Sequence, residues 1–226
     1  MNVVYIDRIL SSLSLCKDCL ERKNKSPSEK LLLKSQGSVL NDFNCVLALN
    51  GDSIFDADIK LKRTNHILYK ASIKEEFGDI YKLQQIQDCL NLITNAFNMV
   101  NTEKVYGNID LMSSNYKFLF ALFEYLKDAK EVLTNPRRKS IEEHITNPKR
   151  KCFHPPVPSD LALSIFIRDS TLILAAYLLE LNQNKRYELA GRITVDCVIP
   201  WISEVLDHLT FSINTCLFLM QKYRIN

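Results

Sequence analysis

The feature of the sequence that most restricts its fold is a stripe of apolar residues between positions 83 and 100. Apolar side chains recur there at alternating intervals of three and four residues, and most of the positions between them are polar. This spacing places the apolar side chains on one face of a helix that packs against partner helices. The stripe consists of Leu83, Ile86, Leu90, Ile93, Phe97 and Val100.

Helical spacing of apolar residues extends over three further segments, 6–20, 114–133 and 200–223. The segment 161–181 is apolar on most sides, and it follows Ser159 and Asp160, which are good helix caps. We therefore predict a central helix at 161–181 and five helical stretches along the chain.

The hydrophobic period changes between the first and second helices. An apolar run at 46–49 leads into Asn50-Gly51, a pair that favours a tight hairpin turn. Apolar and polar residues then alternate over 57–62, and the run 66–73 is typical of another strand. These segments predict a small antiparallel β-meander of two or three strands.

Together these segments predict an α+β, mainly α fold: an antiparallel helix bundle with a small antiparallel β-meander subdomain. We assign residues 1–44 and 74–226 to the bundle and 45–73 to the β subdomain, with 192–198 as an optional additional strand. Because two or three strands are only marginally stable alone, the meander is expected to pack against the helices. The linker 135–158 is the longest stretch predicted to be irregular.

Composition narrows the classes of function. A net charge of +3 is small for a nucleic-acid-binding protein, and five glycines in 226 residues argue against a glycine-rich nucleotide loop. No apolar run reaches the roughly 18 residues of a membrane-spanning helix, and the start of the chain lacks the pattern of a signal peptide. We expect a cytoplasmic protein whose seven cysteines are reduced, without nucleic-acid partners.

Two groups of residues resemble chemical motifs. Cys16 and Cys19 form a CxxC pair, but the pair lies within a helical stripe and the sequence has no second pair of zinc ligands. Cys152 and His154 lack an evident third group of a nucleophilic triad. We predict no catalytic, cofactor-binding or metal-binding residue, and retain a cysteine-dependent hydrolase or redox enzyme as a less favoured alternative.

The linker suggests binding functions instead. Its basic triplets, within 137–151, make a peripheral lipid-binding protein a further alternative. The apolar, proline-rich segment that follows them is suited to docking, and it lies outside the helical stripes, as does the tryptophan near the start of the last helix. The candidate partner-binding residues are Phe153, Pro155, Pro156 and Trp201.

Four segments, in order and spacing, resemble the Rogdi family of leucine-zipper-like proteins: VLALNGD (46–52) followed by ADIKLK, YKLQQIQD (81–88), FHPPVPSDL (153–161) and VDCVIPW (195–201). The resemblance covers residues 45–222. The basic linker and the CxxC pair depart from the family pattern.

The resemblance implies a helix bundle with a small β-domain and a non-enzymatic role without cofactors. The family includes the smaller subunit of the fungal RAVE complex, which helps the peripheral sector of the vacuolar-type proton ATPase to rejoin its membrane sector. The implied partners are a large β-propeller scaffold subunit and that peripheral sector, with recruitment to vacuolar and endosomal membranes. Because the stripe at 83–100 spans fewer than three heptads, we assign it to the chain's own core rather than to an intermolecular zipper.

Overall fold

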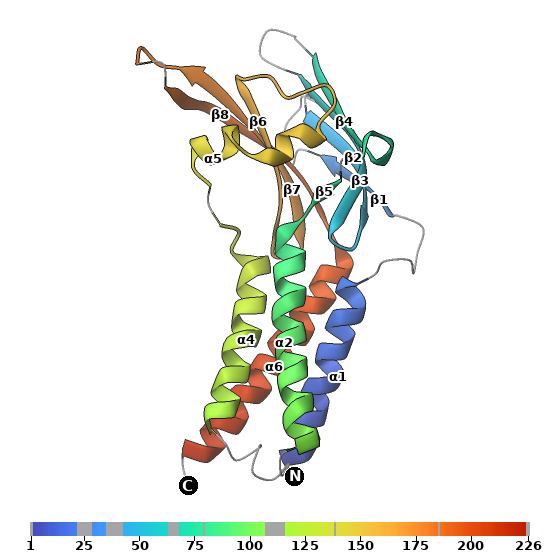
Figure 1. Ribbon diagram of the computed structural model, residues 1–226, viewed down its shortest axis with the longest axis vertical. Helices are drawn as coiled ribbons and strands as arrows, with labels where there is room; N and C mark the ends of the chain where they lie inside the picture. Colours follow the sequence, from blue (N-terminus) through green and yellow to red (C-terminus); the bar gives the residue numbers. More distant parts are fainter. Residues whose placement is uncertain are drawn as a thin grey trace. The chain divides into compact units, whose positions relative to one another are not determined.

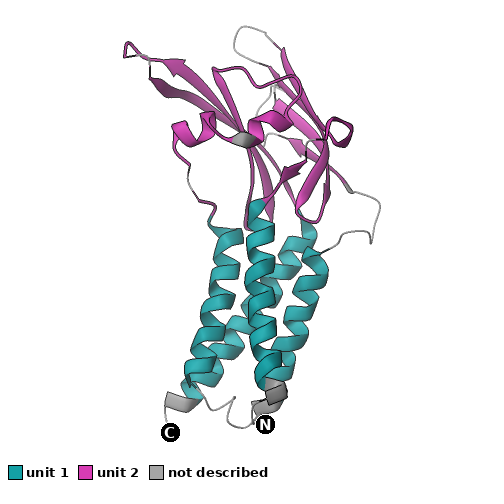
Figure 2. Cartoon of the chain, in the orientation of Figure 1, with its two compact units in different colours: residues 1–22, 84–135, 199–226 teal, residues 23–83, 136–198 magenta. Residues whose placement is uncertain are grey.

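The computed structural model describes residues 2–21, 29–34, 43–62, 68–78, 80–106, 116–137, 139–184 and 186–224. The chain divides into two compact units, which Figure 2 shows in different colours. The helical unit comprises residues 1–22, 84–135 and 199–226, and the β unit comprises 23–83 and 136–198. Among the described residues, no helix is both long and apolar enough to cross a membrane.

The helical unit contains α1 (Asn2–Leu20), α2 (Gln84–Tyr106), α4 (Tyr116–Thr134) and α6 (Pro200–Arg224), as Figure 1 shows. Each helix packs against two others in the cyclic order α1, α2, α4, α6. The contacts of α1 with α6 run in opposite senses along the two helices, which are therefore antiparallel: Tyr5 meets Phe218, Ser12 meets His208 and Cys16 meets Val205. The predicted helices at these four places are confirmed.

The apolar stripe of α2 lies in the core of this unit. Ile86, Ile93 and Val100 are buried, and Cys89 and Ala96 complete the buried face. Leu90 and Phe97 are half-buried at its margin, whereas Leu83, the first residue of the predicted stripe, precedes the helix and is buried in the β unit. The assignment of the stripe to the chain's own core is confirmed, because partner helices within the unit cover it.

The β unit contains one antiparallel sheet in which seven strands follow the order β4-β3-β2-β1-β8-β7-β6, while the short β5 pairs with β3 (Figure 1). The N-terminal and C-terminal groups of strands meet through β1 and β8, where Lys34 lies opposite Asp196. The strands are β1 (Glu29–Lys34), β2 (Phe43–Asn50), β3 (Ser53–Lys62), β4 (Leu68–Lys74), β5 (Tyr81–Lys82), β6 (Leu161–Arg168), β7 (Thr171–Leu181) and β8 (Tyr187–Val198).

The predicted fold class, a mainly helical bundle with a small β-meander, is wrong. The predicted helix at 161–181 is the hairpin β6–β7, and its turn places Asp169 at φ 56°, a left-handed conformation that aspartate tolerates better than most residues. Most of β6 is buried, as expected for a strand covered on both faces. Such a strand has a continuous apolar sequence, which periodicity alone does not distinguish from a central helix.

The linker 135–158 is also more regular than predicted. It contains the short helix α5 (Ile141–Ile145) and the 3-10 helix η2 (Pro148–Cys152). A capping box begins α5, since the Ser140 side chain accepts from the Glu143 N–H and the Glu143 carboxylate accepts from the Ser140 N–H. A further 3-10 turn, η1 (Glu75–Phe77), follows β4 and ends at Gly78, whose φ is 76°.

In both outer strands of the sheet, some main-chain N–H and C=O groups form hydrogen bonds with residues outside the neighbouring strand. On β4, the Ser72 N–H donates to the His154 carbonyl and the His154 N–H donates to the Ser72 carbonyl. On β6, the hydroxyl of Tyr81 donates to the Ile165 carbonyl and accepts from the Ile165 N–H. These contacts occupy main-chain groups that an open strand edge would otherwise present for pairing with another chain.

Candidate interaction surfaces

The structure places the four predicted partner-binding residues in different surroundings. Phe153 and Trp201 are buried, at 1% and 7% exposure, whereas Pro155 and Pro156 are exposed. Trp201 opens α6 in the helical unit, while the other three belong to the β unit. The Phe153 ring packs against that of Tyr81, with centroids 5.9 Å apart. Only the two prolines therefore offer substantial side-chain area to a partner.

The basic linker is largely engaged within the β unit. Arg150 donates to the carbonyls of Val157 and Pro158, both at 2.9 Å, and thus holds the proline-rich segment. Lys149 donates to the Lys82 carbonyl at 2.6 Å, and Arg137 pairs with Glu143 at 2.6 Å. These three cations therefore stabilise the fold of the β unit, whether or not they also bind a partner or a membrane.

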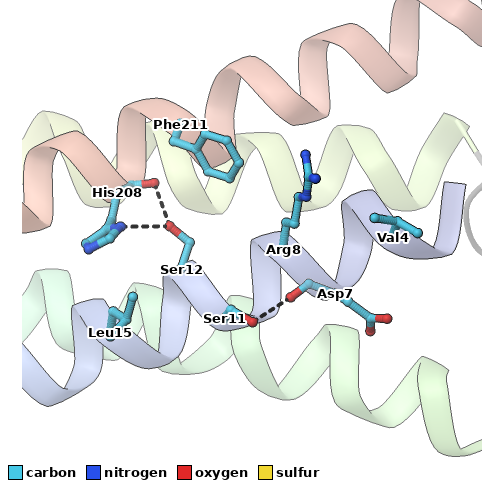
Figure 3. Close-up of a pocket in the computed structure, with 8 residues that line it drawn as sticks. All are labelled: Val4, Asp7, Arg8, Ser11, Ser12, Leu15, His208 and Phe211. Carbon is cyan, nitrogen blue, oxygen red and sulfur yellow. Dashed lines mark hydrogen bonds between the residues drawn. The ribbon is translucent and has the colours of Figure 1, made fainter.

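A surface groove between α1 and α6 has no counterpart in the sequence predictions. It encloses about 410 Å³, and Figure 3 shows the residues that line it. At its floor, the Ser12 hydroxyl donates to the His208 carbonyl at 3.1 Å and lies 3.3 Å from Nδ1 of the same histidine. The lining residues are Val4, Asp7, Arg8, Ser11, Ser12, Leu15, His208 and Phe211.

Large apolar side chains border this groove without being buried. Val4 and Leu15 on α1 are 53% and 47% exposed, and Phe211 on α6 is 45% exposed. Phe218 of α6, which is 49% exposed, lies outside the groove lining and packs against Tyr5 of α1. The two phenylalanines are seven residues apart, so they lie on the same face of α6, two turns apart. Phe211 and Phe218 do not belong to the main apolar stripe of the helix predicted at 200–223. This is the sequence signal that indicates a second, exposed apolar face.

Four of the cysteines are buried. Burial raises the pKa of Cys16, Cys45 and Cys216 to about 12, and burial also raises that of Cys89. A nucleophilic thiol needs the opposite shift, because the thiolate is the reactive form. The prediction that the CxxC pair packs within a helix is confirmed, since Cys16 and Cys19 both lie in α1.

The second suggested pair, Cys152 and His154, is engaged in other contacts. The Cys152 thiol donates to the Ile80 carbonyl at 3.7 Å, and the His154 ring lies against Phe77, with centroids 4.7 Å apart. Among the described residues, no cluster of three or more potential metal ligands is present.

His144 of α5 is a buried titratable group of the β unit. Its ring packs against that of Tyr177 of β7 at a tilt of 33°, with centroids 4.3 Å apart, and its Nδ1 has no hydrogen-bond partner among the described residues. Burial lowers the pKa of His144 most, Lys139 and Arg192 lower it further, and Glu143 acts in the opposite direction. The folded β unit therefore favours the neutral imidazole.

We expect the β unit to lose stability as the pH falls below about 6.5, the pKa of an unperturbed histidine. The unfolded chain then binds a proton that the folded chain, with its lowered pKa at His144, does not yet bind. Urea unfolding of the wild type and of His144→Phe at several pH values measures this effect. The loss between neutral pH and the folded-state pKa should be smaller in His144→Phe, whereas His154→Phe should retain it. Parallel pH profiles for the wild type and His144→Phe would contradict the expectation.

These features define a protein with a four-helix unit and an antiparallel β unit, whose described surface carries exposed apolar and charged side chains. The chain belongs to the Rogdi family: the family model for "Rogdi leucine zipper containing protein" matches residues 5–192. This chain is 27% identical to the human protein rogdi homolog over 224 residues, and the match covers 87% of this chain and 76% of the human protein.

Relatives in invertebrates are similar at the same level. The chain is 27% identical to Drosophila melanogaster protein rogdi over 171 residues, covering 74% of this chain and 61% of that protein. It is 25% identical to the Caenorhabditis elegans rogdi homolog over 228 residues, covering 93% and 76% respectively. The resemblance inferred from four short segments is thus confirmed at the level of the family.

Proposed function

We propose that this chain is a non-catalytic subunit of a RAVE-type complex that promotes assembly and reassembly of the vacuolar-type proton ATPase. It acts by binding a large β-propeller scaffold subunit and the peripheral sector of the ATPase. In this proposal the protein is cytoplasmic and is recruited peripherally to vacuolar and endosomal membranes. Membership of the Rogdi family supports the proposal.

The structural observation that carries a binding role is the apolar border of the α1–α6 groove. Of the residues that line the groove, Phe211 on one helix and Val4 and Leu15 on the other are each about half exposed, and Phe218 is exposed further along α6. Such a face suits an amphipathic helix of a partner, which lays its own apolar side chains between the two helices. Aromatic residues, including phenylalanine, are enriched at the cores of protein–protein interfaces.

The candidates from the sequence enter this proposal with different roles. Pro155 and Pro156 are exposed and are proposed as direct contacts with a partner. Phe153 and Trp201 are buried, so they are proposed to act by holding the proline-rich segment and the start of α6 in place.

Affinity purification from the native cell, followed by mass spectrometry, tests the assembly role directly. We expect recovery of peripheral-sector ATPase subunits and of a very large β-propeller protein. Recovery of neither, from cells in which both are abundant, would overturn the proposal.

A charged residue in the groove should weaken recovery of the scaffold. We expect Phe211→Glu to reduce it about tenfold, because a carboxylate then occupies an interface position suited to an aromatic ring. Phe120→Glu is the matched control, since Phe120 lies on α4 and is 47% exposed, close to the 45% of Phe211. Equal recovery with both variants, at unchanged melting temperature, would exclude the groove as the contact.

A further inference from the structure

One face of the strands β1 to β4 is exposed to solvent, and its cross-strand register is regular. Figure 1 shows these four strands as neighbours in the β unit. The opposite face carries the buried core residues of the same strands, such as Leu33, Cys45 and Ile59. Because side chains alternate between the two faces of a strand, the outer face is formed by the residues between them.

A row of lysines crosses this outer face. Lys34 of β1 lies opposite Asn44 of β2, Asn44 lies opposite Lys60 of β3, and Lys60 lies opposite Lys70 of β4. We call Lys34, Lys60 and Lys70 the lysine row; all three side chains are exposed. Adjacent strands are about 4.8 Å apart, so the row extends about 14 Å across the sheet. At its far end, Asp196 of β8 lies opposite Lys34.

The pairing of Lys60 with Lys70 is unfavourable in the isolated chain. Like charges directly opposite each other in an antiparallel pair destabilise the sheet. Within the described residues neither lysine has an ion pair, whereas the same two strands do pair opposite charges elsewhere: Lys74 lies 2.5 Å from Asp56 and 3.6 Å from Asp58. An anion bound between Lys60 and Lys70 would remove the repulsion.

An apolar pair lies beside the lysine row. Leu32 of β1 and Val46 of β2 face each other, and they are 47% and 40% exposed. The next residue across the sheet is Asp58, which lies opposite Val46 and whose side chain is 60% exposed. The face thus combines positive, apolar and negative groups within a few strand spacings.

This mixture favours a protein partner over a membrane. An anionic bilayer presents negative charge across the whole contact, which is unfavourable for Asp58, because its side chain is 60% exposed and shares Lys74 with Asp56. A protein segment can instead place carboxylates on the lysine row and an apolar side chain over Leu32 and Val46. We propose that the outer face of β1 to β4 binds an acidic segment of a partner protein that also carries apolar residues. This surface shares no residue with the α1–α6 groove, and the inference does not depend on the ATPase role.

Binding of a fluorescent peptide of glutamate and leucine to the full chain tests the inference. Replacing Lys60 and Lys70 together by glutamine should raise the dissociation constant about 3- to 30-fold, from the loss of two surface ion pairs. The control is Lys127→Gln with Lys151→Gln, which removes the same charge from exposed positions elsewhere and should leave the constant unchanged. Binding to the wild type should also weaken as salt is added.

Unfolding would not explain weaker binding by the Lys60/Lys70 variant, because removing this like-charge pair should leave the melting temperature unchanged or raise it. The substitution Val46→Thr should weaken binding of the glutamate–leucine peptide but not of polyglutamate. Equal affinities of the Lys60/Lys70 variant and its control would overturn the proposal. Tighter binding to phosphatidylserine vesicles than to the peptide, lost in the Lys60/Lys70 variant, would also overturn it by identifying a membrane as the occupant.

Discussion

Replacing Ile93 by alanine is expected to lower the free energy of unfolding by about 2–5 kcal/mol while leaving the oligomeric state unchanged. Ile93 is fully buried at the centre of the α2 stripe, where partner helices of the same chain cover it. The substitution leaves a cavity that the surrounding side chains fill only in part. An intermolecular zipper would behave differently, because the loss of a core residue would shift its association equilibrium.

Urea unfolding gives the change in free energy, and light scattering after size exclusion gives the mass in solution. Leu92→Ala is the control, since Leu92 is the half-buried neighbour of Ile93 on the same helix and should cost less. A variant that changes mass in solution, while its unfolding curve remains that of the wild type, would place the stripe between chains.

The helices of this protein could be predicted because each has its own apolar stripe. In α1, all five residues of the predicted stripe, Ile6, Ile9, Leu13, Cys16 and Leu20, are buried. The helical spacing over 114–133 also predicts a stripe that includes Phe118 and Tyr125. The helix α4 is correct but its buried face is rotated, because Leu119 and Leu126 are buried while Phe118 and Tyr125 are half-buried. Large aromatic residues at helical spacing indicate a helix, but they do not show which face of the helix is buried.

The sheet could be predicted only where its strands are exposed on one face. In β3, Ala57, Ile59 and Leu61 alternate with polar residues, and Gly51 in the preceding turn has φ 56°, as the Asn-Gly signal suggests. The strand β1 was missed because it is short and follows a polar segment. The hairpin β6–β7 was missed because burial of both faces removes the alternation on which the prediction depends.

Most residues of the candidate surfaces could not be predicted from the sequence, for a physical reason. Phe153 looked like a docking residue because it lies outside any periodic stripe, yet the core of the β unit buries it against Tyr81. The groove and the lysine row each combine side chains from different elements, so neither is visible as a local motif. Lys60 and Lys70 become neighbours only once the register of β3 and β4 is known.

Replacing Tyr81 by phenylalanine is expected to lower the free energy of unfolding by about 2–4 kcal/mol, although it removes a single oxygen atom. The hydroxyl is fully buried, and it satisfies both main-chain groups of Ile165, at 3.2 Å and 3.1 Å. Burial raises the pKa of Tyr81 to about 12, so the proton that it donates is retained at physiological pH. Without the hydroxyl, a buried N–H and a buried carbonyl of β6 lose their partner.

Tyr69→Phe is the matched control, because Tyr69 is buried in the same unit but donates only a long hydrogen bond, 3.5 Å, to the Pro155 carbonyl. Its effect should be below about 1 kcal/mol. Hydrogen exchange locates the change, since the Ile165 amide should exchange faster in Tyr81→Phe and not in Tyr69→Phe. Equal protection of that amide in the wild type and Tyr81→Phe would mean that β6 does not depend on this hydroxyl. Because β6 ends the sheet, faster exchange there would show that one side chain, contributed from a two-residue strand more than eighty positions earlier, protects main-chain groups that an open edge would present to other chains.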